Sequence, residues 1–306
     1  MPPEPSRTGS DAPPLVTVAM PVFNAGRHLR PAVVSVIRQT FTDWELLVID
    51  DGSSDGAVDD IRDLDDARIR ILRDGSNRGL AARLNEAIDL ARGRYFARMD
   101  QDDISYPERL ARQVEMLEQG TEIDLCAVRC IAINFENELV GAMPYALSHD
   151  EICVAPWRGF YLVHPTWMGR IEWFRQHRYA KPGPYFCEDQ ELLLRSYRKS
   201  RFATVPEVLF AYRVRSRIAW GKTFRTRKTI LGIQLRYFLG MRQWHYGALA
   251  AMVFAVRVMM DSSNMLIQKL WGTAFLGFRI APAGATEHSQ WRAVLEVVML
   301  DEDKKS

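Results

Sequence analysis

The sequence contains few cysteines and carries almost no net charge. Its 306 residues include four cysteines, Cys126, Cys130, Cys153 and Cys187, which form no CxxC pair and have no histidines at zinc-site spacing. This excludes a zinc-finger type of site, and we expect reduced, mostly buried thiols. Lys and Arg total 40 against 38 Asp and Glu, a formal net charge of +2. No overall field therefore favours nucleic acid, and any charged site must be local.

Segments that target or anchor a chain are also scarce. Residues 1–14 are rich in Pro and lack the basic start and apolar run of a signal peptide, so we expect a disordered leader on a cytoplasmic protein. The apolar run 246–256 is interrupted by Arg257, short of the roughly 20 residues that span a bilayer. The sequence therefore predicts no membrane-spanning helix.

Short apolar runs alternate with amphipathic stretches from residue 15 onward. The runs predict strands at 15–22, 44–50, 69–72, 95–99 and 125–133, and the stretches predict helices at 29–40, 57–64, 80–91 and 107–119. This order predicts an α/β fold with a mostly parallel, Rossmann-like sheet flanked by helices on both faces. Ligands of such sheets bind beyond the carboxyl ends of the strands.

An acidic cluster follows the strand predicted at 95–99. Asp100, Asp102 and Asp103 stand together in the segment RMDQDD. So much negative charge in a crevice is unfavourable unless a cation neutralises it, and carboxylate oxygens suit Mg²⁺ or Mn²⁺. The alternative is a solvated acidic turn that caps the helix beginning near Pro107.

Four motifs occur in a fixed order, each at a strand end or a helix start: AMPVFN, VIDDGSSDG, NRGLAARLNEAI and MDQDD. Together they resemble the nucleotide-sugar half of family 2 glycosyltransferases, which have the glycosyltransferase A fold. The resemblance is dense over residues 15–112 and continues weakly to about residue 215. It implies an inverting, metal-dependent hexosyltransferase that uses a nucleotide sugar.

The resemblance assigns donor-binding roles to the first three motifs. It implies that Asp51 accepts a hydrogen bond from the uracil imide of a UDP-sugar, with Gly52 taking a positive φ in the turn. Arg83 occupies the family's arginine position and is a candidate contact to a phosphate or a base carbonyl of the donor. Arg78 is a second candidate, although a loop arginine is often only solvated. The base pocket is expected to be lined by Pro21, Phe23 and Asn24.

The resemblance makes Asp100 and Asp102 the DxD pair that binds the donor and Mn²⁺ or Mg²⁺. Asp102 is the expected principal ligand, and Asp103 is either a further ligand or a residue that orients the loop.

A second acidic pair, Glu188 and Asp189, precedes an amphipathic helix. Helix capping alone explains such acids, yet the segment resembles the one that supplies the family's general base, and Asp189 matches that base. The helix dipole is expected to keep Asp189 ionised. In the segment VHPTWMGR, His164 is a candidate contact to the diphosphate or the acceptor, or else a structural histidine. Trp167 either stacks on a sugar ring or packs in the core.

Two departures from the family pattern concern the region before residue 220. Arg215 stands where relatives often have histidine, so the resemblance does not carry a metal contact over to this position, and a direct arginine contact to the diphosphate is the alternative. No arginine directly precedes Trp220, so the Arg-Trp motif of processive synthases is missing. This favours transfer of a single sugar.

The remaining C-terminal part is basic, amphipathic and helical in pattern. We expect a catalytic domain at 15–219, with a nucleotide-sugar half at about 15–112 and an acceptor half at about 113–219, and a helical region at 220–306. That region either lies on the inner face of the cytoplasmic membrane or packs on the catalytic domain or on a second subunit.

The sequence as a whole predicts transfer of one sugar from a UDP-sugar to a glycan or lipid-linked acceptor hydroxyl in cell-surface glycan or exopolysaccharide biosynthesis. A nucleotidyltransferase is the enzymatic alternative, but AMPVFNAGR lacks its glycine-rich triphosphate loop. The non-enzymatic alternative is a catalytically inactive binding module of the same fold. The presence of both Asp102 and Asp189 argues against this alternative. A Rossmann dehydrogenase is disfavoured because no GxGxxG follows the first strand.

Overall fold

The first four long strands form a parallel sheet. The computed structural model describes residues 12–184, 186–214, 220–271 and 280–299. Strands β1 (Val16–Val22), β2 (Trp44–Asp50), β3 (Ile69–Arg73) and β4 (Tyr95–Arg98) lie in the order β3-β2-β1-β4, all parallel. Every residue of β1 and β2 is buried, because helices cover both faces of this part of the sheet.

The sheet continues beyond β4 with mixed pairing. It adds β5 (Ile104–Ser105), β6 (Leu125–Ile133), β7 (Leu139–Ala142), β8 (Met168–Arg170) and β9 (Phe202–Arg213). Strand β8 is antiparallel to β4 and β6, β6 and β9 are parallel, and β5 and β7 pair antiparallel with β9 and β6. The predicted parallel sheet is therefore confirmed for β1–β4, and the following half is mixed.

The helices divide the core between the two faces of the sheet. Val18 and Met20 of β1 pack with α1 (Leu29–Ile37) and α3 (Arg109–Gln119) on one face, while Ala19 packs with α2 (Leu80–Leu90) on the other. The short helices are α4 (His149–Cys153), α5 (Ile171–Gln176), α6 (Glu188–Ser196), η1 (Gly26–His28), η2 (Pro156–Arg158) and η3 (His164–Thr166). Alternation of side chains along each strand explains the two cores.

The helix predicted at 57–64 is wrong. The structure has successive turns there, held by bonds such as Asp59 N–H to the Gly56 carbonyl, at 2.9 Å, and Leu64 N–H to the Ile61 carbonyl, at 3.1 Å. Aspartates compete for backbone hydrogen bonds and favour turns, so a polar stretch with repeated aspartates does not continue as a helix.

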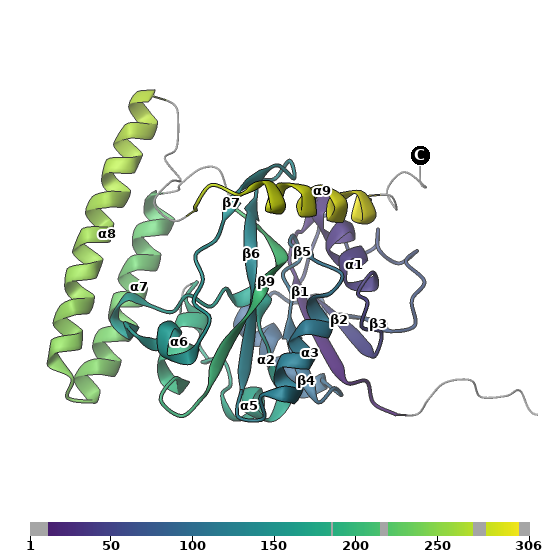
Figure 1. Cartoon of the computed structure of the whole chain (residues 1–306), viewed down its shortest axis with the longest axis horizontal. Helices are drawn as coiled ribbons and strands as arrows, with labels where there is room; N and C mark the ends of the chain where they lie inside the picture. The colour runs from purple at the N-terminus through teal and green to yellow at the C-terminus, as the bar shows by residue number, and fades with distance from the viewer. Residues whose placement is uncertain (1–11, 185, 215–219, 272–279, 300–306) are drawn as a thin grey trace, which may run out of the picture.

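The C-terminal region consists of a helical hairpin and a returning helix (Figure 1). Helices α7 (Trp220–Gly240) and α8 (Trp244–Trp271) pack against each other at one side of the molecule. Helix α9 (Ala285–Met299) crosses the end of the sheet near β5 and β7, where Trp291 stacks on Tyr106 at a ring-centroid distance of 6.5 Å.

The apolar part of helix α8 is longer than the run 246–256 that stands out in the sequence. By length and composition, Trp244–Ile267 is able to cross a membrane, and little of it is buried in the protein. Apolar residues continue on both sides of Arg257, and the Arg257 guanidinium donates to the carbonyl of Arg158 in η2 at 2.8 Å. The hairpin thus contacts the rest of the chain through this hydrogen bond and through aromatic packing, since Tyr246 of α8 stacks on Trp157 at a ring-centroid distance of 4.8 Å.

Candidate functional site

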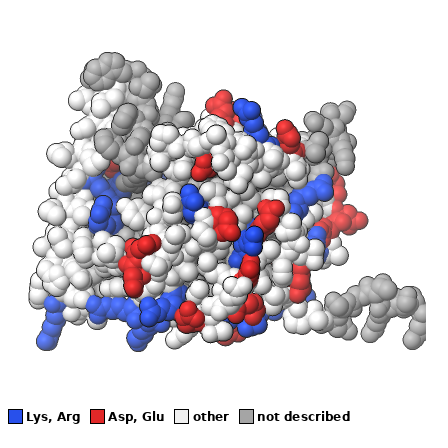
Figure 2. Space-filling model, viewed as in Figure 1, with Lys and Arg blue, Asp and Glu red and all other residues white. Residues whose placement is uncertain are grey.

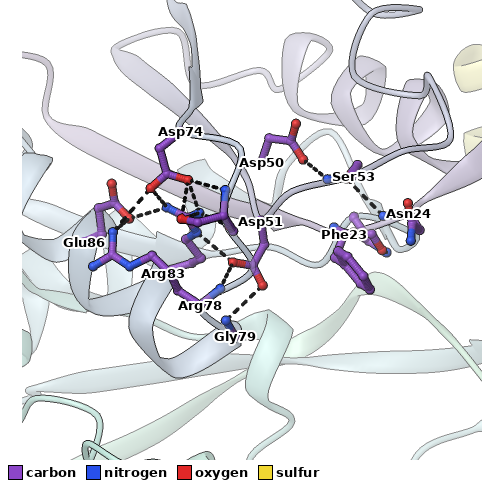
Figure 3. A network of polar contacts seen from close by, with 12 residues as sticks. Phe23, Asn24, Asp50, Asp51, Ser53, Asp74, Arg78, Gly79, Arg83 and Glu86 are labelled. Atoms are coloured by element: carbon purple, nitrogen blue, oxygen red, sulfur yellow. Dashed lines mark hydrogen bonds and ion pairs between the residues drawn. The ribbon is translucent and has the colours of Figure 1, made fainter.

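The turn after β2 holds Asp51 against the start of α2 (Figure 3). The Asp51 carboxylate accepts the N–H groups of Arg78, at 2.7 Å, and Gly79, at 2.9 Å. Gly52 has φ +81°, as expected from the sequence, and a Cβ there would lie 3.2 Å from the Ser76 carbonyl carbon. The turn and the loop before α2 therefore pack too closely for a side chain at residue 52.

Arg83 lies beneath this turn and is almost completely buried. Its Nε donates to Asp51 at 2.8 Å, and its other N–H groups reach Asp74, Glu86 and the Ser76 carbonyl. All five N–H groups of the guanidinium are used by protein acceptors, which favours a role for Arg83 in positioning Asp51, and its expected contact with a donor stays a prediction. The guanidinium thereby holds the loop of residues 74–79 against Asp51. By contrast, the Arg78 side chain is 45% exposed.

Phe23 and Asn24 form the neighbouring wall, and Pro21 is buried in β1 behind them. Phe23 is 46% exposed, although its backbone is fixed from both sides. The Phe23 N–H donates to Oε1 of Gln101 at 2.6 Å, and Nε2 of Gln101 donates to the Phe23 carbonyl at 3.1 Å. Asn24 accepts the N–H of Ser54 at 2.9 Å. Gln101 therefore connects the first motif to the acidic loop.

The acidic loop brings three carboxylates together at the end of β4. Asp100 forms an ion pair of 2.6 Å with Arg98. Burial and the nearby Asp100 raise the pKa of Asp102 to about 6. Asp103 is buried, and burial followed by the charges of Asp100 and Asp102 raises its pKa well above the usual range. Burial therefore disfavours the ionised forms of Asp102 and Asp103, and the neighbouring carboxylates add to this cost.

Arg213 of β9 supports the acidic loop from the opposite side. Its N–H donates to Oδ1 of Asp103 at 2.7 Å, and its Nε donates to the Asp102 carbonyl at 2.6 Å. Oδ2 of Asp103 is buried and has no hydrogen-bond partner among the residues that the structure describes. Arg215, the arginine singled out in the sequence, lies outside these residues.

These properties fit a divalent cation at the acidic loop. The donors are hard carboxylate oxygens, and one of them is buried without a partner among the described residues. The pKa values of Asp102 and Asp103 rise because of burial first and neighbouring negative charge second. Within the described ranges, no three His, Cys, Asp or Glu side chains converge closely enough to hold a metal by themselves. Mg²⁺ and similar ions commonly take one or two carboxylates and complete their shell with phosphate oxygens and water.

The second acidic pair begins α6. Burial, followed by the charge of Asp189, raises the pKa of Glu188 to about 7. Burial also raises the pKa of Asp189, whose Oδ2 accepts Nε2 of Gln190 at 3.2 Å. Desolvation therefore outweighs the hydrogen bonds and charges that lower the pKa of Asp189, and the expectation that the helix dipole keeps Asp189 ionised stays a prediction. A raised pKa makes Asp189 a stronger base once ionised.

In the segment VHPTWMGR, His164 lies near Glu188, and the ring of Trp167 packs edge-on against His164. His164 is buried, its Nε2 is 2.8 Å from the Tyr179 hydroxyl, and its Nδ1 is 4.0 Å from Oε1 of Glu188. Burial and the charge of Arg98 lower the pKa of His164 well below its usual value, so the ring is neutral. Trp167 is fully buried and donates to the Leu162 carbonyl at 3.1 Å. Sugar stacking by Trp167 is thus ruled out in favour of core packing.

Arg98 connects the two acidic sites, and the sequence analysis missed it. Its side chain is 3% exposed, and its Nε and Nη1 have no partner among the described residues. Besides pairing with Asp100, Arg98 carries a positive charge that offsets part of the rise in the pKa values of Glu188 and Asp189. An arginine inside a predicted buried strand, directly before MDQDD, was the available signal. Gln101 and Arg213 carried no comparable signal, because their partners are distant in sequence.

Known proteins match this arrangement over most of the sheet. Residues 17–178, just over half of the chain, match the model of the family described as Glycosyl transferase family 2. The chain belongs to glycosyl transferase family 2. An uncharacterized glycosyltransferase of Haemophilus influenzae is 30% identical over 213 residues, which cover 66% of this chain and 66% of that protein.

A second relative from the same family is the UDP-Glc:alpha-D-GlcNAc-diphosphoundecaprenol beta-1,3-glucosyltransferase WfgD of Escherichia coli. It is 38% identical over 103 residues, 34% of this chain and 41% of that protein. The matches thus span from about two fifths to just under two thirds of these relatives.

Solved glycosyltransferases share the fold. The crystal structure of S. aureus TarS in complex with UDP-GlcNAc has a TM-score of 0.59 at 15% identity, over 93% of this chain and 80% of that one. The mannosyltransferase PcManGT from Pyrobaculum calidifontis, in complex with GDP-Man and Mn²⁺, has a TM-score of 0.56 at 16% identity, over 95% and 88%. The glycosyltransferase A fold predicted from the sequence is therefore confirmed.

Proposed function

We propose that this chain transfers one sugar from a UDP-sugar to an acceptor hydroxyl, with inversion, in cell-surface glycan assembly. The supporting observation is that two carboxylate sites with different roles, Asp100–Asp102 and Asp189, lie around the buried Arg98 in a family 2 glycosyltransferase fold. The catalytic domain spans 15–219, with the donor bound by about 15–112 and the acceptor by about 113–219.

The donor base is assigned to the pocket of Phe23, Asn24 and Asp51. Oδ2 of Asp51 accepts one bond from Gly79, which leaves acceptor capacity for the imide N–H of uracil. The exposed ring of Phe23 offers a stacking surface next to it. Arg83 positions Asp51, and Arg78 is the arginine left to reach the diphosphate.

Asp102, with Asp100, is assigned to hold Mg²⁺ or Mn²⁺ against the diphosphate. When bound, the cation stabilises negative charge on the leaving nucleoside diphosphate. Asp103 orients the loop through its bond to the Arg213 N–H, and Arg98 offsets the charge of Asp100.

Asp189 is assigned as the base that removes the proton of the acceptor hydroxyl. Its raised pKa favours proton uptake, and its place on an open cleft gives an acceptor access. Glu188 neighbours the neutral His164 and raises the negative potential around Asp189, so it has a supporting role.

The Asp189→Asn variant tests this assignment. It keeps the shape of the side chain and removes the basic oxygen, so transfer should fall by about 10²–10⁴-fold while UDP binding is unchanged. Glu191→Gln is the matched control, since Glu191 lies in the same helical turn and pairs with Arg195 at 2.9 Å. Near-normal transfer by Asp189→Asn would exclude Asp189 as the base.

Donor hydrolysis across a panel of nucleotide sugars, with and without Mn²⁺, tests the donor half. We expect metal-dependent turnover of a UDP-sugar, and we expect Asp102→Asn to weaken Mn²⁺-dependent UDP binding at least about tenfold. Equal turnover of every donor without metal contradicts the assignment of Asp102.

Peripheral contact of α8 with the cytoplasmic membrane surface is a second part of the proposal. Met252, Val256 and Met259 are 58%, 45% and 63% exposed, spaced so that they share one face of α8. Figure 2 shows few charged side chains over α8 and a gathering of Lys and Arg along the edge of the molecule where α7 and α8 join. Apolar contact combined with basic charge suits an anionic surface.

Co-sedimentation of the full chain with phosphatidylglycerol vesicles tests this contact. The double variant Met252→Gln, Met259→Gln should bind less, whereas Val297→Gln, which changes an equally apolar exposed residue on α9, should bind normally. Equal sedimentation of all three proteins excludes docking by α8.

A further inference from the structure

A large open cleft lies between the catalytic body and the α7–α8 hairpin. Its volume is about 990 Å³, and its walls come from residues 142–145, 158–165 and 280–282 and from α6, α7 and α8. Asp189 lies on this wall, whereas Asp51, Phe23 and Asn24 do not. Under the proposed function, the cleft is therefore on the acceptor side of the base.

Three arginines from three different elements line the hairpin side of this cleft. They are Arg158 of η2, Arg227 of α7 and Arg257 of α8. Arg227 forms an ion pair of 3.0 Å with Asp261. Across the described part of the chain, no carboxylate lies within ion-pair distance of Arg158 or Arg257. The wall thus carries more positive than negative charge.

This positive charge is partly removed from water. Arg257 is half-buried, and its guanidinium donates a hydrogen bond to the neutral carbonyl of Arg158. Burial, followed by the charge of Arg227, lowers the pKa of Arg257. Like charges held together at a partly desolvated wall are unfavourable unless an anion pairs with them. Guanidinium groups are especially suited to phosphate oxygens.

We propose that Arg158 and Arg257, supported by Arg227, bind a diphosphate that belongs to the acceptor. The phosphate would hold the acceptor in the cleft so that its sugar hydroxyl reaches Asp189. This inference rests on the proposed function, and it adds the chemical class of the acceptor and the residues that recognise it.

The other walls of the cleft suit the rest of such an acceptor. Tyr145 and Tyr161 line it with 48% and 43% of their surface exposed, and Ile230 and Met143 add apolar area. Exposed aromatic and aliphatic surface in a concave site is typical of ligand binding. A sugar ring or a lipid chain next to the phosphate therefore has a surface to cover.

The donor's own diphosphate does not explain the three arginines. It belongs with the acidic loop and its cation, and neither Asp100 nor Asp102 lines this cleft. The arginines lie on η2, α7 and α8, outside the β1–β4 half in which the donor-binding motifs are found. A second phosphate, carried by the acceptor, accounts for their position.

Binding is tested by calorimetry with the full chain saturated with UDP and Mg²⁺, so that the donor site is occupied. The probes are farnesyl diphosphate, inorganic pyrophosphate and farnesol. Wild type should bind at least one of the two diphosphates, and Arg158→Gln, Arg257→Gln should each weaken that binding about tenfold. Arg236→Gln is the matched control, an identical change at an exposed arginine of α7 outside the cleft, and should leave it unchanged.

The probes also identify the source of the phosphate. Tighter binding of farnesyl diphosphate than of pyrophosphate indicates a lipid-carried acceptor, and equal binding indicates phosphate recognition without a lipid. Absence of diphosphate binding, or equal affinity in wild type and the Arg158→Gln, Arg257→Gln double variant, overturns the proposal. Arginine-dependent binding without any donor hydrolysis would instead contradict the proposed function and leave this site intact.

Discussion

Replacement of Arg83 by methionine separates a positioning arginine from a donor-binding one. Methionine keeps most of the length and apolar contacts of the stem and removes the guanidinium. The Arg83 side chain is 1% exposed, and its Nε bonds Asp51, whose side chain is 7% exposed. Loss of one partner from such a buried pair costs about 3–5 kcal/mol, because the other charge stays buried.

The structure indicates that the loss of stability lies at the lower end of this range. Asp51 keeps two backbone N–H bonds, from Arg78 and Gly79, when the guanidinium is removed. Asp74 and Glu86 are more exposed, so water can replace their lost bonds. We therefore expect a loss of about 3 kcal/mol in the free energy of unfolding.

Urea denaturation and UDP calorimetry give the two measurements. Arg78→Met is the comparison, since Arg78 is 45% exposed and its ion pairs contribute about 0–1 kcal/mol. Arg83→Met should lose both stability and UDP affinity, because the loop that carries the Asp51 partners is released. Stability within about 1 kcal/mol of wild type, combined with lost UDP affinity, would refute the positioning role and restore Arg83 as a donor ligand.

Three other substitutions test further parts of the site. Glu188→Gln should increase the free energy of unfolding by about 2 kcal/mol at pH 8 and by less at pH 5. The pKa of Glu188 in the folded protein, about 7, exceeds the ordinary 4.5, so the ionised carboxylate lowers stability as the pH rises from 4.5 to 7. An equal gain in stability at both pH values contradicts this reasoning. Trp167→Phe should lower stability by about 1–3 kcal/mol with an unchanged acceptor KM, measured by denaturation and initial rates; a raised KM at unchanged stability would favour sugar stacking. Gln101→Ala should raise the donor KM severalfold by releasing the Phe23 backbone, and an unchanged KM would show that this clamp is dispensable.

Local sequence patterns were sufficient for most elements of the parallel half of the sheet. The runs that became β1, β2 and β4 are apolar and flanked by turn residues, so their burial is visible without knowledge of their neighbours. The stretch 57–64 was misassigned because its apolar spacing is compatible with both a helix and packed turns. Hydrogen bonding by aspartate, a local competition with the helix, decided between them.

The sequence by itself determined the family, the sheet and the carboxylates at the strand ends, because these follow from residue type, spacing and order. Only the tertiary structure decided which charged groups face each other. The guanidinium of Arg83 is fully hydrogen-bonded to Asp51 and to groups around the loop before α2. Arg98 lies between Asp100 and the start of α6, and Trp167 is buried in the core. A side chain's free partners and its pKa depend on the burial created by segments distant in sequence, and no local pattern records that burial.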